Sequence, residues 1–320
     1  MALTLDDLYA SPDHYLHSFE GEDAVFVPMD RAAYHRSIFL DHRISAASEG
    51  SLRVSVESLA NYPVCPKTMS WIFQIAHCGS TLLARALDQP DYALVLREPF
   101  ALRQIALDTD RQRLPLVRAM LGKRYLSNIP TIAKGNVPIN SLLPSLIALS
   151  PGDHAIFLYC PLRDYLLAVL RTPEHRAWVR GITSQLCQHL GDLEGASDAE
   201  RAAALWLFQM RAFKAAMLLM PGSVSLDATR FFEAPHIGLA AAASHFGMSL
   251  PAARVAQIVE GPIFATNAKR PGVPFDNAAR MESRASLEHT IRTELDDGQA
   301  WVEASGAGEV TLDRPLIAIA

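Results

Sequence analysis

An apolar run, Trp71-Ile72-Phe73-Gln74-Ile75-Ala76, leads into a small-residue turn, His77-Cys78-Gly79-Ser80, and then into Thr81-Leu82-Leu83-Ala84-Arg85-Ala86-Leu87. The run is typical of a buried strand, and the leucines and alanines that follow give a helix one apolar face. A sharp strand-to-helix turn directs the first backbone N–H groups of the helix, and the Ser80 and Thr81 hydroxyls, to one place beyond the strand. The segment therefore predicts an anion site. The alternative is a plain connection in which Ser80 is the N-cap.

The same alternation of short apolar runs and amphipathic stretches continues along the chain. The runs predict strands at 70–76, 92–96, 131–134, 155–159 and 223–226. The stretches between them predict helices at 81–88, 100–108, 141–149 and 164–171. A longer helix is expected over 201–220, after the capping-box pair Ser197 and Glu200 and before Pro221-Gly222. This order indicates an α/β fold with a central parallel sheet of about five strands and helices on both faces.

The flanking regions do not follow this rhythm. We expect residues 1–65 to form a lead-in of short helices and turns, packed on a main α/β domain of residues 66–320. Residues 180–200 contain three glycines and are expected to form a loop. Residues 261–276 contain three prolines and are expected to form a long connection, and such connections often close over sites.

Charge and composition exclude several classes of function. The chain has 320 residues, of which 50% are hydrophobic, and its 29 Lys and Arg against 34 Asp and Glu give a net charge of −5. This is the balance of a soluble globule. No overall basic field exists to attract nucleic acid or an acidic membrane, so an anionic ligand requires a local site.

The sequence favours a cytoplasmic protein. The N-terminus is acidic where a signal peptide would be basic, and the longest apolar stretches, 215–220 and 237–243, are shorter than the roughly 20 residues that a membrane helix needs. Four cysteines form no C-x-x-C pair and no zinc-binding spacing, so we expect free thiols and no metal site; these are Cys65, Cys78, Cys160 and Cys187.

The anion site lacks the features of a nucleoside-triphosphatase loop, G-x-x-x-x-G-K-[ST]. Gln74 stands at the first Gly position and Ser80 at the Lys position. Magnesium-dependent hydrolysis of ATP or GTP is therefore disfavoured.

The shorter loop resembles the 5′-phosphosulfate loop of sulfotransferases that use 3′-phosphoadenosine-5′-phosphosulfate (PAPS), with His77 in place of a cation. Leu96-Arg97-Glu98-Pro99 is similar to the protein-tyrosine sulfotransferases and their bacterial relatives, and 131–134 resembles their third strand, which ends in Lys. Residues 224–235 and 245–247 are similar to their late strand and the helix after it. The resemblance covers roughly residues 70 to 250 and implies a three-layer α/β/α fold of the P-loop NTPase type.

The resemblance also implies an activity, the transfer of a sulfuryl group from PAPS to a hydroxyl or amine. By this likeness Glu98 is the base, Lys134 and His77 face the bridging and sulfuryl oxygens, and the 5′-phosphate is cradled by Cys78, Gly79, Ser80, Thr81 and Leu82. Each of the three side chains has a structural alternative. Glu98 could be a helix-start acid, Lys134 a strand-end surface cation, and His77 a satisfied polar residue of the turn.

The chain departs from this family where the 3′-phosphate is bound. The family uses an Arg at the end of the fourth strand and a Ser on the next helix, and here Cys160 and Ala168 take those positions. Arg163, Arg171, or Lys269 with Arg270 could replace them, because long cationic side chains reach neighbouring positions. Otherwise the donor lacks a 3′-phosphate or the site is vestigial.

A second hypothesis follows from the same departure. The chain could be a non-catalytic or divergent P-loop nucleotide-binding protein, with a kinase-like phosphate donor. The residues leave the acceptor and the oligomeric state open.

Overall fold

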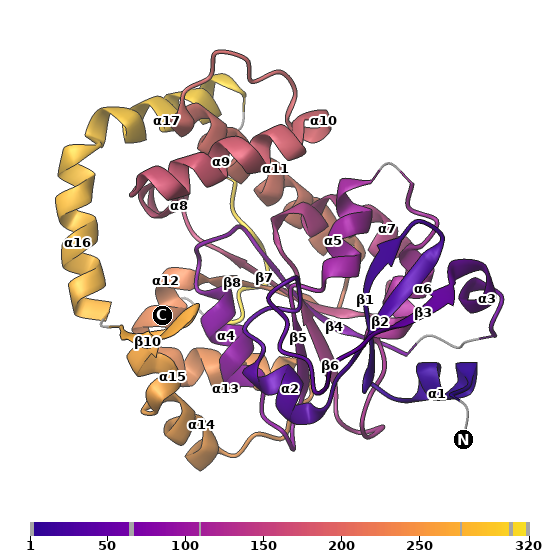
Figure 1. The fold of residues 1–320 in the computed structure, drawn as a ribbon. Helices are drawn as coiled ribbons and strands as arrows, with labels where there is room; N and C mark the ends of the chain where they lie inside the picture. The colour runs from indigo at the N-terminus through magenta and orange to yellow at the C-terminus, as the bar shows by residue number, and fades with distance from the viewer. Residues whose placement is uncertain (1–2, 64–66, 109, 276, 307–309, 318–320) are drawn as a thin grey trace.

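Five parallel strands form the central sheet of the molecule (Figure 1). The structure is a computed structural model and describes residues 3–63, 67–108, 110–275, 277–306 and 310–317. The strands lie in the order β5-β6-β4-β7-β8. Their bounds are β4 Ser70–Gln74, β5 Leu94–Arg97, β6 Thr131–Lys134, β7 His154–Tyr159 and β8 Ser223–Asp227. The predicted fold class is confirmed, and each strand lies within a few residues of its predicted place.

The central strands are buried on both faces, as parallel strands between two helical layers must be. Every residue of β4, β5 and β6 is buried. An aromatic stack crosses the sheet and continues into a helix: the ring centroids of Phe73 and Phe157 are 5.4 Å apart, and those of Phe157 and Phe213 are 4.8 Å apart.

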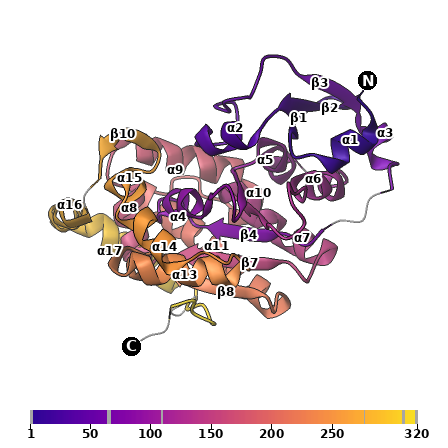
Figure 2. The same ribbon diagram turned by 90° about the horizontal axis from the view of Figure 1, so that it is seen from below.

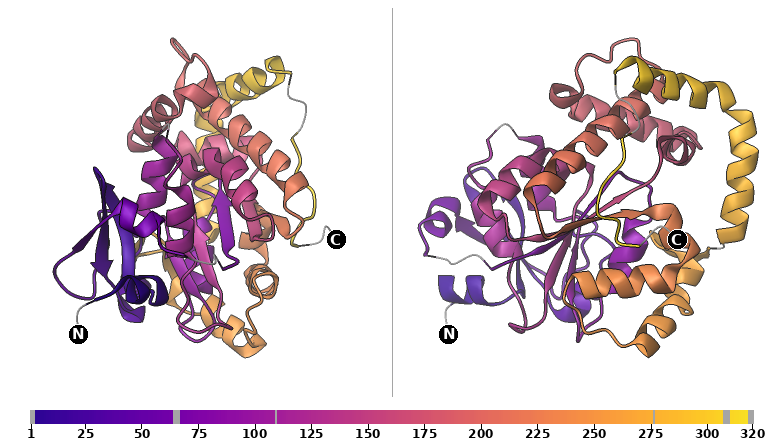
Figure 3. Two further views of the ribbon diagram at one scale, coloured as in Figure 1. Left: turned by 90° about the vertical axis from the view of Figure 1, so that its right-hand side faces the viewer. Right: turned by 180° about the vertical axis from the view of Figure 1, so that it is seen from behind.

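Helices cover the two faces of the sheet, which gives the predicted three layers. α4 (Ser80–Leu87) and α13 (Pro235–His245) lie on one side, and α7 (Leu143–Leu149) and α11 (Asp198–Leu219) lie on the other (Figures 1 and 3). The remaining helices of this domain are α5 Phe100–Leu107, α6 Leu114–Leu121, η1 Val137–Leu142, α8 Leu162–Val169, α9 Pro173–Gln185, α10 Cys187–Leu190, α12 Ala228–Glu233, α14 Ala252–Val259, α15 Pro262–Ala265, α16 Asn277–Thr290 and α17 Arg292–Ala304.

The long helix α11 begins with the predicted capping box between Ser197 and Glu200. Among the described helices it is the one that is long and apolar enough to span a membrane, but 61% of its most apolar 18 residues are buried inside the structure. The helix is buried because it packs on the sheet, where the ring of Phe213 contacts that of Phe157.

The strand order places a topological switch beside β4. The chain leaves β4 for β5, passes to β6 next to β4, and then crosses β4 to reach β7 on its other side. Loops at the carboxyl ends of such strands turn away from one another and leave a crevice. The loop between β4 and α4 lies at this point.

The N-terminal segment differs from its prediction. Short helices are present at α1 (Leu5–Ala10), α2 (Arg31–Arg36) and α3 (Val56–Ala60), but an antiparallel sheet was missed: β1 His14–Glu20, β2 Asp23–Pro28 and β3 Leu52–Ser55 (Figure 2). A break in the pairing register between Leu16 and Ser18 interrupts the alternation of apolar residues that marks a strand. The sheet contacts α5, where the Gln104 side chain bonds the backbone N and O of Phe19 at 2.8 and 3.0 Å.

Two predicted loops are also more ordered than expected. Most of residues 180–200 belong to α9, α10 and α11. Gly181 lies within α9, and a helix tolerates one internal glycine at a small cost in stability. The connection 261–276 contains α15 and a hairpin of β9 (Thr266–Asn267) and β10 (Arg270–Pro274). Cys65 and Asp276 lie outside the described residues.

A buried ion cluster joins the N-terminal segment to the sheet. The Asp88 carboxylate, fully buried after α4, accepts a hydrogen bond from Arg97 Nη1 at 2.9 Å and forms an ion pair with Arg31 Nη2 at 2.8 Å. Arg97 also donates to the backbone oxygens of Tyr34 and Ser37 at 2.5 Å. Although burial works in the opposite direction, the His35 hydrogen bond and the two guanidinium groups lower the pKa of Asp88 to about 2.

We expect Asp88→Asn to lower the free energy of unfolding by about 3 to 5 kcal/mol at pH 7, because it leaves a buried guanidinium without its counter-charge. A depressed carboxyl pKa stabilises the fold above its unfolded value and loses that effect as pH falls through the folded value. The difference between the two proteins should therefore shrink between about pH 4 and 2. Urea unfolding across this range measures it, with the exposed Asp91→Asn as control; equal stability at pH 7 would contradict the role.

Candidate functional site

A cavity of about 880 Å³ lies at the carboxyl ends of β4, β5 and β6. Its floor is the loop between β4 and α4, with Glu98 after β5 and Lys134 at the end of β6. Its walls come from α9, from the 266–275 hairpin and from residues 39–43 of the N-terminal segment. The cavity therefore occupies the crevice that the strand order creates.

The loop makes its sharp turn through left-handed backbone conformations. Ala76, His77 and Gly79 have φ angles of 71°, 54° and 84°. Gly79 is the N-cap of α4, and a Cβ atom at this position would lie 2.9 Å from Cζ of Phe232. The turn thus needs a glycine both for its backbone angle and for the close approach of the ring.

The start of α4 has the properties of an oxyanion site. The first backbone N–H groups of a helix, here those of Ser80, Thr81 and Leu82, have no partner within the helix, and these residues line the cavity. The Thr81 Oγ1 atom is buried and has no hydrogen-bond partner in the described structure. A hydroxyl without a partner, beside amides that have no partner within the helix, fits a phosphate group.

Glu98 and Lys134 form an ion pair in the floor of the cavity. The side chain of Lys134 is 2% exposed and that of Glu98 is 16% exposed. The backbone N of Glu98 donates to the carbonyl of Lys134 at 2.8 Å, which aligns the ends of the two strands. A carboxylate and an ammonium group are thus held together at the floor of the cavity.

Backbone strain is concentrated at this site. Four described non-glycine residues have positive φ, and three of them, Ala76, His77 and Glu98 (φ 57°), line the cavity. Such conformations cost of order 1 to 3 kcal/mol each and persist where the surrounding structure holds them in place, which is common at functional sites.

His77 is buried in the cavity wall between two other rings. Its ring centroid is 4.6 Å from that of His175 and 5.2 Å from that of Trp178. Burial and the neighbouring Lys269 lower the pKa of His77 well below its usual value, and burial with Arg171 lowers the pKa of His175 to about 4. Both imidazoles are therefore neutral at pH 7, and His77 offers a hydrogen bond to the cavity without a charge.

The positive charge of the cavity comes from other residues. Seven Lys and Arg side chains line it against three Asp and Glu. Lys269 and Arg171, two of the residues that the sequence singled out, are among the seven. This excess is local, because the whole chain has a net charge of −5. Such a lining favours an anion with more than one negative charge.

Two sequence-derived expectations are placed elsewhere. Arg163 is not among the residues that line the cavity and binds Glu288 and Asp296 at 2.7 and 3.4 Å on the surface. The Cys78 thiol is buried against the Leu158 carbonyl at 3.7 Å, so Cys78 can contribute only its backbone. Gly79, Ser80, Thr81 and Leu82 line the cavity as expected, and the roles assigned to all these residues remain predictions.

Several lining residues were missed from the sequence. The lining also includes four apolar side chains, those of Phe39, Phe100, Trp178 and Ile182. Asn136, two residues after Lys134, also lines it, and its Oδ1 atom is buried without a partner in the described structure. No local motif marks these residues, because they come from four separate parts of the chain.

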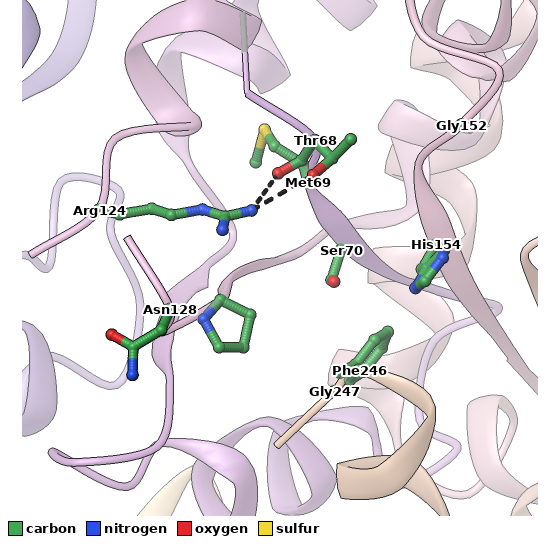
Figure 4. Close-up of a pocket in the computed structure, with 10 residues that line it drawn as sticks. Thr68, Met69, Ser70, Arg124, Asn128, Gly152, His154, Phe246 and Gly247 are labelled. Carbon is green, nitrogen blue, oxygen red and sulfur yellow. Dashed lines mark hydrogen bonds between the residues drawn. The ribbon is translucent and has the colours of Figure 1, made fainter. Parts of the chain in front are cut away.

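A second cavity, of about 210 Å³, lies at the opposite end of the sheet, where β4 and β7 begin (Figure 4). The Arg124 guanidinium in its wall is engaged by backbone oxygens, those of Thr68 at 2.6 Å and Ser127 at 3.0 Å. Within the described residues no group of three or more His, Cys, Asp or Glu is placed to hold a metal ion.

Comparison with known proteins adds little. No model of a known protein family matches the chain, and no curated protein sequence matches it. The crystal structure of a sulfotransferase from Alicyclobacillus acidocaldarius aligns with 75% of this chain and 96% of its own, at 12% sequence identity and a TM-score of 0.44. At this level the fold assignment rests on the strand order and layers described above.

Gly79→Ala tests the turn. We expect it to lower the free energy of unfolding by about 1 to 3 kcal/mol, because the new methyl group meets Phe232 and the φ angle disfavours a side chain. Gly181→Ala is the matched control, since open space surrounds this position in α9 and the same change should stabilise the helix by about 0.5 to 1 kcal/mol. Urea denaturation compares the two; the same sign for both would contradict the description of the turn.

The neutral state of His77 predicts a pH dependence. Since its pKa is depressed in the folded protein, the unfolded chain takes up a proton near pH 6.5 that the folded chain refuses. Stability should therefore fall below pH 6.5, and His77→Gln should reduce that slope by up to about 1.4 kcal/mol per pH unit. Unfolding between pH 7 and 5 measures the slope, with the exposed His289→Gln as control. An unchanged slope in His77→Gln would mean that the folded protein does not depress the pKa of this ring.

Proposed function

We propose that this protein transfers a sulfuryl group from PAPS to a hydroxyl or amine acceptor. The observation that supports this most strongly is the Glu98–Lys134 pair in the same cavity as the loop between β4 and α4. A base, a cation and an oxyanion cradle are the groups that such a transfer requires, and they meet at one place.

The residues of the loop fit the phosphate end of the donor. The backbone of Cys78 to Leu82 and the orphaned Thr81 hydroxyl would hold the 5′-phosphate, and His77 and Lys134 would face the sulfuryl oxygens. Bound PAPS supplies the sulfuryl group, whose bond to the 5′-phosphate breaks as a bond to the acceptor forms.

Glu98 and Lys134 act in concert in this proposal. The Glu98 carboxylate accepts the proton of the acceptor hydroxyl or amine. Lys134 has three N–H donors, of which one serves Glu98 and the others can face the leaving phosphate. When Glu98 becomes protonated its negative charge is lost, so the charge of Lys134 is left to stabilise the phosphate. The apolar lining residues Phe39, Phe100, Trp178 and Ile182 would contact the non-reacting part of the acceptor.

The alternative is a nucleotide-binding protein with a kinase-like donor, and the Cys160 and Ala168 substitutions favour it. Competition between PAP, the desulfated product of PAPS, and ATP in calorimetry separates the two hypotheses. Tighter binding of ATP would favour the alternative. For either activity we propose a cytoplasmic location, which the free thiols of Cys78, Cys160 and Cys187 support.

Glu98→Gln tests the proposal. We expect it to retain PAP affinity within about threefold and to lose 10² to 10⁴-fold in transfer, because the amide cannot accept the proton. Calorimetry measures PAP binding, and release of label from radiolabelled PAPS to a panel of alcohols, phenols and amines measures transfer.

Two further variants make this result decisive. Glu98→Asp keeps the counter-charge of buried Lys134 and should be intermediate, so it guards against simple misfolding of Glu98→Gln. Glu288→Gln removes a surface carboxylate that is also paired with a cation, Arg163, and should match the parent protein. Full transfer by Glu98→Gln would exclude Glu98 as the base, and absence of PAP binding by the parent protein near millimolar concentration would exclude PAPS.

A further inference from the structure

Five of the seven cations that line the cavity have no carboxylate partner in the described part of the chain: Arg103, Arg171, Lys269, Arg270 and Arg280. By contrast, surface arginines such as Arg163 and Arg176 are paired with acids. In a chain with more acids than bases, a group of unpaired cations around one cavity is an uncompensated charge that a ligand would neutralise.

Arg280 reaches the cavity from α16 and lies next to the loop. Its Cζ atom is 4.3 Å from the centre of the Phe232 ring, and the edge of that ring is the group that a Cβ at Gly79 would meet at 2.9 Å. Arg280 and the turn are thus separated by a single aromatic ring. The Arg280 Nη1 donates to Asn277 Oδ1 at 2.8 Å, which fixes the guanidinium, and its other donors have no hydrogen-bond partner among the described residues.

Arg171 follows α8, and its guanidinium is held by His175 of α9. Its Nη2 lies 2.9 Å from His175 Nε2, and His175 Nδ1 is 2.7 Å from Thr172 Oγ1. A neutral imidazole orients the guanidinium without neutralising it. Burial lowers the pKa of Arg171, and burial with Arg284 lowers the pKa of Arg280, while Arg171 adds to the repulsion at Arg280. Both side chains line the same cavity, Arg171 from the end of α8 and Arg280 from α16.

We propose that Arg171 and Arg280 form a second anion subsite, which binds the second phosphate group of a nucleoside bisphosphate or diphosphate whose first phosphate lies at the start of α4. The inference rests on the proposed function and specifies which side chains take over where Cys160 and Ala168 stand. This subsite needs neither Arg163 nor a cation at positions 160 and 168, because α16 brings the Arg280 guanidinium from a different part of the chain.

Binding of three nucleotides tests this subsite directly. AMP carries one phosphate group. PAP carries a second phosphate at the 3′ position of the ribose, and ADP carries a second phosphate attached to the first one. We expect PAP or ADP to bind at least tenfold more tightly than AMP, since an added phosphate gains charge-assisted hydrogen bonds. Preference for PAP places the second phosphate on the ribose, and preference for ADP places it on the phosphate chain; either preference supports the subsite.

Arg280→Gln and Arg171→Gln should each weaken the preferred two-phosphate nucleotide by roughly ten- to a hundredfold and leave AMP within about threefold. Arg163→Gln, a surface arginine paired with Glu288, is the control and should change neither affinity. Arg280→Lys keeps the charge but not the planar fork, and it should fall between the parent protein and Arg280→Gln. Calorimetry measures all of these affinities without any acceptor.

Each contrary result has a distinct meaning. Equal affinity of the parent protein for AMP, PAP and ADP would exclude the subsite while leaving the loop site intact. Equal weakening of AMP and the two-phosphate nucleotide by Arg280→Gln would show that Arg280 serves the first phosphate. Absence of binding by all three nucleotides would overturn the proposed function together with the subsite.

Discussion

The buried pair of Lys134 and Glu98 is the constraint on which the site depends. An ammonium that is 2% exposed needs a counter-charge, and Glu98 supplies it from the end of the neighbouring strand. To do so Glu98 adopts a left-handed backbone conformation, which the strand-end hydrogen bond to Lys134 and the buried partners of Arg97 hold in place. Fold and chemistry are therefore coupled, because the groups that stabilise β5 and β6 also aim the carboxylate.

Much of the fold was predictable because it is written in local patterns. The five strands are short apolar runs, and the Ser197 cap and the Pro221-Gly222 pair mark the two ends of α11. The N-terminal sheet was missed because a register break at Leu16 and Ser18 hides its alternation. Gly181 suggested a loop, but the packing of the rest of α9 outweighs the small cost of one glycine in a helix.

The candidate site divides in the same way. Residues 76–82, Glu98 and Lys134 follow predicted strands, and parallel strands bring their carboxyl ends to one edge, so their meeting could be foreseen. Arg280 and Trp178 reach the cavity through the path of later helices, which no pattern near them reveals. The lowered pKa of His77 likewise depends on its burial and on residues distant in sequence, Lys269 and His175.

The Asp88 cluster has a consequence for how the chain can be divided. The sequence pattern changes near residue 65, which suggests a domain boundary there. Arg97, which adjoins Glu98, nevertheless donates hydrogen bonds to the backbone oxygens of Tyr34 and Ser37, and Asp88 forms an ion pair with Arg31. Phe39 adds a wall to the cavity from the same side of that boundary. A chain that starts after residue 65 would keep all five central strands. It would lose Arg31, Tyr34 and Ser37, the partners of Asp88 and Arg97, and with them the contacts that hold Glu98 in place. The first sixty residues are therefore as necessary for the site as the sheet is.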